Sequence, residues 1–199
     1  MMPAWIKRLR KDEAGVSILE FALLAPTLLV MLFGLLDLAY NMYTSQMLQG
    51  AIQSAARKAT IEGAGTDSAA IDGVVSTAVR AIAPSATLTF TRKSYSSFTE
   101  VGRPEDYTDV NGNGTCDANE PFEDANENGN WDLDPGQTGF GSARDAVLYT
   151  VDVNYPRLFP IFNFIPGQSS TFSMSVSTVL RNQPYGQQDA SAPPMGNCT

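Results

Sequence analysis

Histidine is missing from this chain of 199 residues. Its absence removes the commonest general base of enzymes and the commonest side-chain ligand of zinc. The sequence also has no nucleophile elbow and no phosphate-binding glycine loop. Paired carboxylates occur only in one acidic segment, where metal binding explains them better. These absences together argue against an enzyme.

Cysteine is scarce, since Cys116 and Cys198 are the only two and form no Cys-x-x-Cys pair. In an exported chain two cysteines permit one disulfide. Their spacing alone leaves open whether Cys116 and Cys198 meet.

Positive charge is scarce as well, because the formal net charge is −8. Residues 100–136 hold eleven of the 21 acidic residues and one base, Arg103, so this segment carries −10 and the rest of the chain +2. No basic stripe is left to neutralise phosphates. We therefore expect no nucleic-acid partner.

A long apolar run follows the basic residues 7–11. Residues 16–36 contain one charge, Glu20, and as a helix they span ~31 Å, about the thickness of a bilayer core. The positive-inside rule then puts the N-terminus in the cytoplasm and the chain after about residue 40 outside. A cleaved secretory signal fits less well, because its apolar region is shorter and ends at a small-residue site.

Glu20 needs an explanation, because a carboxylate inside a membrane helix is costly. In one interpretation it lies shallow enough to reach the lipid headgroups. In the other, cleavage after Gly15 creates an α-amino group on Val16, and Glu20 becomes the fifth residue of the mature chain. An ammonium and a carboxylate attract strongly at low dielectric, within one subunit or between neighbours.

A glycine, an apolar run and a glutamate at its fifth place resemble the cleavage motif of type IV pilins and pseudopilins. Over residues 14–60 the chain resembles, more narrowly, the TadE-like family of the tight-adherence (Flp-type) pilus machinery. The resemblance implies a minor pilin or pseudopilin of the bacterial inner membrane. A prepilin peptidase would cut it after Gly15, and it would assemble with other pilin subunits. The residues that carry the resemblance are Gly15, Glu20, Phe21, Pro26, Gly34, Asp37, Ala55, Ala56 and Arg57.

The pattern along the chain predicts an α+β fold. Helical spacing predicts a long helix over 16–62 and a second over 67–82, and alternation predicts strands at 86–95, 145–156 and 170–182. Such an order favours a small antiparallel sheet packed on the long helix. We expect a leader (1–15), a transmembrane helix (16–36), the first part of a pilin-like domain (37–96), an acidic insert (97–142), its remaining strands (143–182) and a flexible tail (183–199).

An aromatic, proline-punctuated stretch occupies residues 158–165. It has three interpretations. Cover of the hydrophobic core is favoured, and contact with another subunit or with the outer face of the membrane are the alternatives.

The acidic insert contains DVNGNGTCDANE at residues 109–120, which has the ligand spacing of an EF-hand calcium loop. Side-chain oxygens stand at places one, three, five and nine, a backbone carbonyl at place seven and a glutamate at place twelve. Gly114 at place six allows the sharp turn. The predicted ligands are Asp109, Asn111, Asn113, Thr115, Asp117 and Glu120.

A second loop begins fifteen residues later, and this repeat supports a tandem array. Pro135 stands at its twelfth place and has no side-chain oxygen, so Asp134 or Glu123 would have to substitute. The predicted ligands of this loop are Asp124, Asn126, Asn128, Asn130 and Asp132.

Prolines near both loops argue against flanking helices, so the loops look like the tandem calcium loops of extracellular bacterial repeats. Bound Ca²⁺ would neutralise part of the charge of the insert and let it fold. The competing interpretation is a disordered acidic loop without metal.

Two functions from different classes follow. The first is a calcium-stabilised pseudopilin that takes part in pilus assembly. The alternative is a calcium-dependent adhesion or binding module that the N-terminal helix tethers to the outside of the membrane.

Overall fold

The computed structural model describes residues 16–61, 68–142, 145–181 and 192–199. Two compact units divide the described chain. The first unit comprises the N-terminal part of the long helix, through Tyr43, together with Pro156–Phe172. The second unit comprises Thr44–Tyr155 and Ser173–Thr199. Helices and sheets occur together, so the predicted α+β class is confirmed.

Helix α2 runs from Val16 to Ile61 without a break, and Pro26 lies inside it. Among the described residues one helical stretch, Val16–Arg57, is long and apolar enough to cross a membrane, and none of its most apolar window is buried. An apolar helix that no protein side chains cover is what a lipid environment stabilises. Membrane anchoring is therefore plausible, as the sequence predicts.

The main sheet of the second unit has the strand order β3-β1-β4-β5. Strand β1 (Thr87–Tyr95) pairs antiparallel with β4 (Ala146–Pro156) along its whole length and with β3 (Gln137–Thr138) on its other edge. Strand β5 (Thr171–Arg181) lies beside β4. Strands β1, β4 and β5 match the three predicted segments. The expected insert, however, supplies β3, because the chain returns to the free edge of β1.

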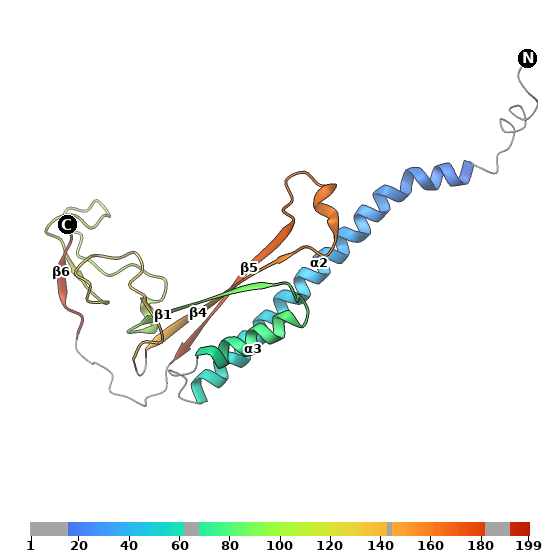
Figure 1. The fold of residues 1–199 in the computed structure, drawn as a ribbon. Helices are drawn as coiled ribbons and strands as arrows, with labels where there is room; N and C mark the ends of the chain where they lie inside the picture. The colour runs from blue at the N-terminus through green and yellow to red at the C-terminus, as the bar shows by residue number, and fades with distance from the viewer. Residues whose placement is uncertain (1–15, 62–67, 143–144, 182–191) are drawn as a thin grey trace, which may run out of the picture. The chain divides into compact units, whose positions relative to one another are not determined.

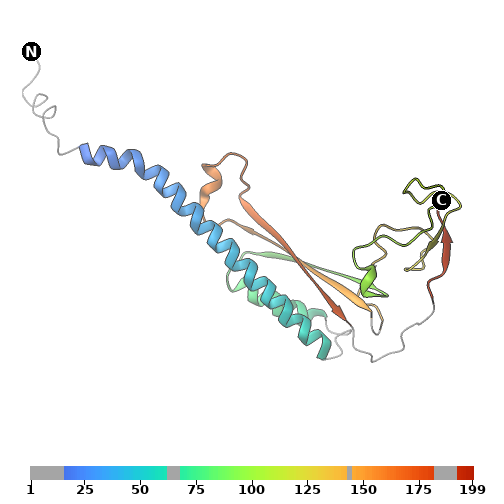
Figure 2. The same ribbon diagram turned by 180° about the vertical axis from the view of Figure 1, so that it is seen from behind.

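Side chains of two helices and one face of β4 form the hydrophobic core of the second unit. Alternation along β4 directs one set of side chains to the core, and the short helix α3 (Ser68–Arg80) turns a stripe at every fourth residue toward it. Figures 1 and 2 show α3 beside the C-terminal part of α2. The buried members include Leu48, Ile52, Ala55, Ile71, Val75, Val79, Val147, Tyr149, Val151, Val153 and Tyr155.

A charged cluster ties α3 to the sheet. Asp72 of α3 forms an ion pair with Arg92 of β1 and accepts a hydrogen bond of 2.8 Å from the Tyr149 hydroxyl. The Arg92 guanidinium lies 4.9 Å from the centre of the Tyr149 ring. Burial raises the pKa of Tyr149, and the hydrogen bond to Asp72 raises it further. The phenol therefore keeps its proton and remains a donor to Asp72.

The C-terminal residues dock on the acidic insert. Strand β6 (Met195–Asn197) pairs antiparallel with β2 (Pro121–Glu123), and a disulfide joins Cys198 to Cys116, whose Cα atoms are 5.6 Å apart. Gly196 packs against the Phe122 ring so closely that a Cβ atom there would overlap it. The expectation of a loose tail is therefore wrong for residues 195–198, because a backbone ladder and a covalent bond hold them.

The aromatic residues 158–165 belong to the first unit. A short helix, η3 (Pro160–Asn163), lies within them. Leu158 is 61% exposed and Phe164 67% exposed. The favoured interpretation, cover of the hydrophobic core, is therefore wrong for these two side chains.

Candidate functional site

The predicted processing site lies at the start of α2. Gly15 is outside the described residues, and Val16 is the first residue of the helix. The side chains of Val16 and Glu20 are both exposed. Cleavage after Gly15 stays a prediction, as does the pairing of Glu20 with a new α-amino group.

The first predicted calcium loop is folded around Asp109. One carboxylate oxygen of Asp109 accepts the backbone N–H of Gly112 at 2.6 Å, and the other accepts that of Gly114 at 2.8 Å. Gly114 has a φ of 77°, which favours glycine. Asn111 and Asn113 accept backbone N–H groups two residues further on. The side chains at places one, three and five therefore all turn toward the inside of the loop.

Glu120 closes this loop from its twelfth place. One carboxylate oxygen accepts the N–H of Val110 at 2.8 Å, and the other accepts the N–H of Asp117 at 3.0 Å. The two donors are the second and ninth residues of the loop. Glu120 is only 3% exposed, so its charge lies inside the loop structure and not on the outer surface.

The second loop repeats this arrangement. Asp124 accepts the N–H groups of Asn128 at 3.0 Å and Gly129 at 2.7 Å, and Gly129 has a φ of 79°. Asn126 and Asn128 again accept N–H groups two residues further on. The internal repeat in the sequence is therefore a repeat in backbone structure.

Glu105 takes the part in the second loop that Glu120 has in the first. One carboxylate oxygen accepts the N–H of Ala125 at 2.9 Å, and the other accepts that of Asp132, also at 2.9 Å. Ala125 and Asp132 are the second and ninth residues of this loop. The carboxylate that closes the second loop therefore comes from before both loops in the sequence.

The sequence suggested Asp134 or Glu123 for this place. Asp134 instead accepts a hydrogen bond of 2.8 Å from the Tyr95 hydroxyl and pairs with Lys93. Glu105 is held by two backbone contacts to the second loop, from its own N–H to Asp132 and from the Trp131 indole to its carbonyl. No spacing rule connects residue 105 with a loop that starts at 124, so sequence reasoning had no signal for it.

The surroundings of Glu105 and of Asp117 shift their pKa values in opposite directions. Burial raises the pKa of Glu105, and the nearby carboxylates of Asp124 and Asp132 add to this. Hydrogen bonds from Asn113 and Asn111 lower the pKa of Asp117. A buried carboxylate among other carboxylates is the kind of group that a bound cation would stabilise.

The donor sets of the two loops fit a hard cation, because every predicted donor is an oxygen. Among the residues that the structure describes, however, no three Asp, Glu or Cys side chains converge as a metal-binding group. Asp117 and Asp132 accept hydrogen bonds from asparagine amides at places three and five of their loops. A cation would have to replace these amide donors.

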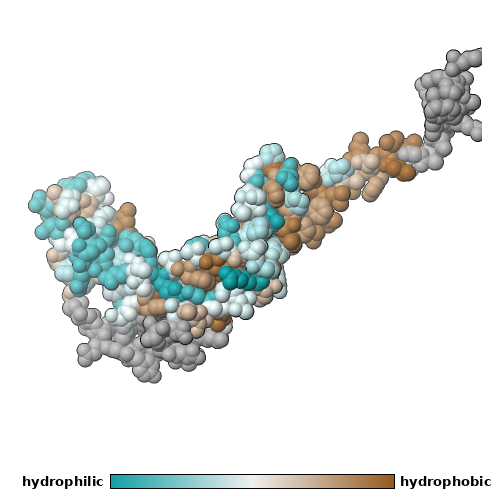
Figure 3. All heavy atoms as spheres, in the orientation of Figure 1, coloured by the Kyte–Doolittle hydropathy of each residue, from teal (hydrophilic) through white to brown (hydrophobic). Residues whose placement is uncertain are grey.

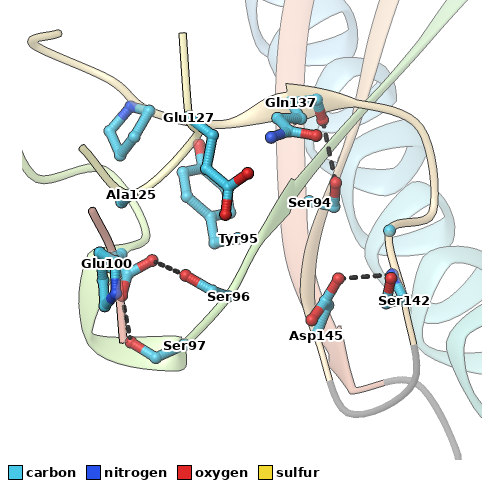
Figure 4. Close-up of a pocket in the computed structure, with 13 residues that line it drawn as sticks. Ser94, Tyr95, Ser96, Ser97, Glu100, Ala125, Glu127, Gln137, Ser142 and Asp145 are labelled. Atoms are coloured by element: carbon cyan, nitrogen blue, oxygen red, sulfur yellow. Dashed lines mark hydrogen bonds between the residues drawn. The ribbon is translucent and has the colours of Figure 1, made fainter. Parts of the chain in front are cut away.

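Figure 4 shows a pocket of about 460 Å³ beside the second loop, with serine hydroxyls and carboxylates in its wall. The hydroxyls of Ser96 and Ser97 donate to Glu100 at 2.6 and 3.0 Å, and Asp145 accepts the N–H of Ser142. Among the residues that the structure describes, which omit 143–144, none that lines the pocket is cationic. This wall suits a cationic or polyhydroxylated ligand better than an anion.

Comparison with known proteins gives a match to a family model. No curated protein and no solved structure matches the chain. The family model described as TadE-like protein matches residues 15–57, which include the apolar part of α2. TadE-like proteins are typically non-enzymatic proteins of the Tad pilus context. Residues 15–57 of this chain are therefore similar to the TadE-like family.

Proposed function

We propose that this protein is a membrane-anchored pseudopilin that takes part in assembling a tight-adherence (Flp-type) pilus. One observation carries the proposal: the TadE-like match includes the most apolar window of α2, and no residue of that window is buried by the described chain. Such a helix needs either lipid or other apolar helices around it. In a pilin-type subunit, lipid surrounds the helix before the subunit joins a pilus, and the helices of other subunits surround it afterwards.

Glu20 is the residue to which we assign the assembly role. It lies on the exposed surface of α2, where a neighbouring subunit can reach it. A prepilin peptidase would cut after Gly15 and create the α-amino group of Val16. Pairing of that ammonium with the carboxylate of Glu20 offsets the cost of placing either charge at low dielectric.

We assign calcium to the two loops of the insert as a stabilising ion. The first site would use Asp109, Asn111, Asn113, Thr115, Asp117 and Glu120. The second would use Asp124, Asn126, Asn128, Asn130 and Asp132, with Glu105 as the closing carboxylate. The equal placement of Glu105 and Glu120 supports two sites of one kind. When bound, calcium supplies positive charge to a segment of formal charge −10.

The processing claim is tested at the N-terminus of protein extracted from membranes of the bacterium that encodes it. Mass spectrometry is expected to find a chain that starts at Val16. Recovery of only the Met1 form would contradict cleavage after Gly15.

The assembly claim is tested by Glu20→Ala in a strain that lacks the wild-type chain. The variant is expected to reach the membrane in normal amounts and to leave the cells without pili. Thr27→Ala, on an exposed position of the same helix, is the matched control and should restore piliation. Normal pili in the Glu20→Ala strain would contradict the role of Glu20 in assembly.

The alternative is a tethered adhesion or binding module, and the polar pocket beside the second loop favours it. An adhesion assay in cells without pili distinguishes the two proposed functions. Adhesion that persists in such cells and disappears with the chain would support the module, whereas adhesion lost together with the pili supports the assembly protein.

A further inference from the structure

Residues 157–170, the segment between β4 and β5, are named here the aromatic segment. They belong to the same compact unit as the N-terminal part of α2, and Figures 1 and 2 show them beside this helix. No charged residue follows Arg157 within the segment. It is therefore an apolar element attached to the helix that we assign to the membrane.

Two contacts attach the segment to α2. The rings of Phe33 and Phe159 stack, with centroids 5.7 Å apart and an interplanar angle of 21°. One helical turn later, Arg157 forms an ion pair with Asp37, which also accepts a hydrogen bond of 3.0 Å from Asn41. Along the helix the apolar contact thus comes first and the charged contact one turn later. This is the order expected where a helix leaves the hydrocarbon core and enters the headgroup region.

Arg157 also closes the segment on itself. Its backbone N–H donates to the carbonyl of Ser170 at 2.9 Å, and its side chain donates to the carbonyl of Ser169 at 3.0 Å. The Asp37 and Arg157 side chains are 3% and 12% exposed. The ion pair therefore fixes both ends of the segment at one level of the helix.

The level follows from helix geometry. With a rise of 1.5 Å per residue, Phe33 lies ~26 Å and Asp37 ~32 Å along the helix from Val16. The hydrocarbon core of a bilayer is about 30 Å thick. If the span begins near Val16, Phe33 lies just inside the outer boundary of the core and Asp37 just beyond it. Phe159, stacked on Phe33, lies at the same depth as Phe33.

Three large apolar side chains of the segment are exposed, beside the exposed polar residues Asn163 and 168–170. Leu158 is 61%, Phe164 67% and Ile165 37% exposed. Figure 3 shows apolar side chains along the face of α2 that is in view. Tyr40 and Tyr43 follow on the same helix, at the level where aromatic residues gather at a membrane interface. The exposed apolar side chains thus continue the surface that the helix presents to lipid.

We propose that the aromatic segment enters the outer leaflet of the membrane that α2 spans, as a second, interfacial anchor. Leu158, Phe164 and Ile165 contact lipid, while the ion pair of Asp37 with Arg157 stays at the headgroup level with its charges compensated. The inference rests on the proposed membrane anchoring of α2. Aromatic side chains at the boundary between headgroups and acyl chains are a usual means of such attachment.

Fluorescence quenching by brominated lipids tests this depth in the full chain. The protein is reconstituted in vesicles of phosphatidylethanolamine and phosphatidylglycerol whose acyl chains carry bromine either near the headgroup or near the chain end. Phe164→Trp is the reporter, and Ile165→Trp is a second reporter should the first fail to fold. The signal of Trp5 and Trp131, measured in the unsubstituted chain, is subtracted.

The added tryptophan at 164 is expected to lose more than half of its fluorescence with bromine near the headgroup and less with bromine near the chain end. Phe21→Trp in α2 reports whether the helix itself is in the bilayer, and Phe98→Trp in η2 (Phe98–Glu100) is the control, expected to remain unquenched.

Quenching at 21 without quenching at 164 and 165 would overturn the inference and leave a protein partner as the occupant of this surface. No quenching at 21 would overturn the proposed membrane anchoring itself.

Discussion

The carboxylate of Glu105 accepts a hydrogen bond of 2.9 Å from the backbone N–H of Asp132, 27 residues further along the chain. Glu120 makes the equivalent bond to Asp117 across three residues. Two loops of the same form are thus closed by carboxylates that reach them from opposite directions in the sequence. This relationship makes Glu105 as informative a target for mutation as Glu120.

Glu105→Gln is expected to weaken calcium binding to the second loop by roughly ten- to a hundred-fold, because it removes the closing carboxylate charge. Calorimetric titration of the full chain in detergent micelles with Ca²⁺ should show two binding events, of which this variant weakens one. Glu120→Gln should weaken the other. Glu123→Gln, at an exposed position of β2, is the matched control. No heat from the unsubstituted chain would contradict the calcium proposal, and two unchanged events with Glu105→Gln would contradict the role of Glu105.

Loss of the disulfide is expected to destabilise the insert. Cys116 and Cys198 are 82 residues apart, and the chain-entropy model gives about 4.5 kcal/mol for a closed loop of this length. The double variant Cys116→Ser, Cys198→Ser should therefore unfold at a lower urea concentration than the oxidised protein. A reductant should move the unsubstituted protein to the same midpoint and leave the double variant unchanged. A reductant effect in the double variant would show that another process is responsible.

Asp37→Asn is expected to loosen the aromatic segment. The substitution leaves the guanidinium of Arg157 buried without its carboxylate, and breaking a buried pair in this way costs about 3–5 kcal/mol. Hydrogen exchange in detergent micelles should become faster in residues 157–170. Adding Arg157→Gln should restore part of the protection, because it removes the unpaired charge. Asp152→Asn, at an exposed position of β4, should change nothing, and equal exchange in Asp37→Asn would show that the ion pair does not hold the segment.

Stability is expected to fall in alkaline solution through Tyr95. Burial, with the hydrogen bond to Asp134 next, raises the pKa of Tyr95 to about 12 from the ordinary 10.0. The folded state then holds the phenol proton more tightly than the unfolded state does. The stabilising contribution is therefore complete below the unfolded pKa and is lost as pH rises toward the folded pKa.

Urea unfolding between pH ~9 and ~12 measures this effect. The free energy of unfolding should fall more steeply for the unsubstituted protein than for Tyr95→Phe. Tyr43→Phe, where the side chain is exposed, should follow the unsubstituted protein. Parallel curves for Tyr95→Phe and the unsubstituted protein would contradict the assignment.

Much of the fold could be predicted because its signals are local. The apolar run of α2, the fourfold spacing of Ile71, Val75 and Val79 in α3, and the alternation of Val147, Tyr149, Val151 and Val153 in β4 each repeat with the period of one element. The predicted ends of α2 and of the three main strands differ from the observed ones by a residue or so. The Asp and Asn spacing in the insert likewise predicted two loops, since each is a short, continuous motif.

Distant contacts could not be predicted in the same way. Glu105 contacts the second loop because an antiparallel bridge pairs Tyr107 with Phe122. This bridge brings the residues just before Tyr107 next to the start of the second loop. Residues 195–198 dock because β2 offers a free edge and Cys116 a partner for Cys198. The aromatic segment reaches α2 through Arg157 and Asp37, 120 residues apart. Each of these depends on which elements meet, and no local pattern encodes that.

The sequence by itself therefore determined the helices, the strands, the apolar span and the ligand-type spacing of the loops, because these follow from the periodicity of neighbouring residues. Only the tertiary structure decided which carboxylate closes the second loop, where the C-terminal residues lie and that the aromatic segment is attached to α2. The physical reason is that burial and hydrogen bonding between distant segments are satisfied together, when the whole chain packs, and not residue by residue.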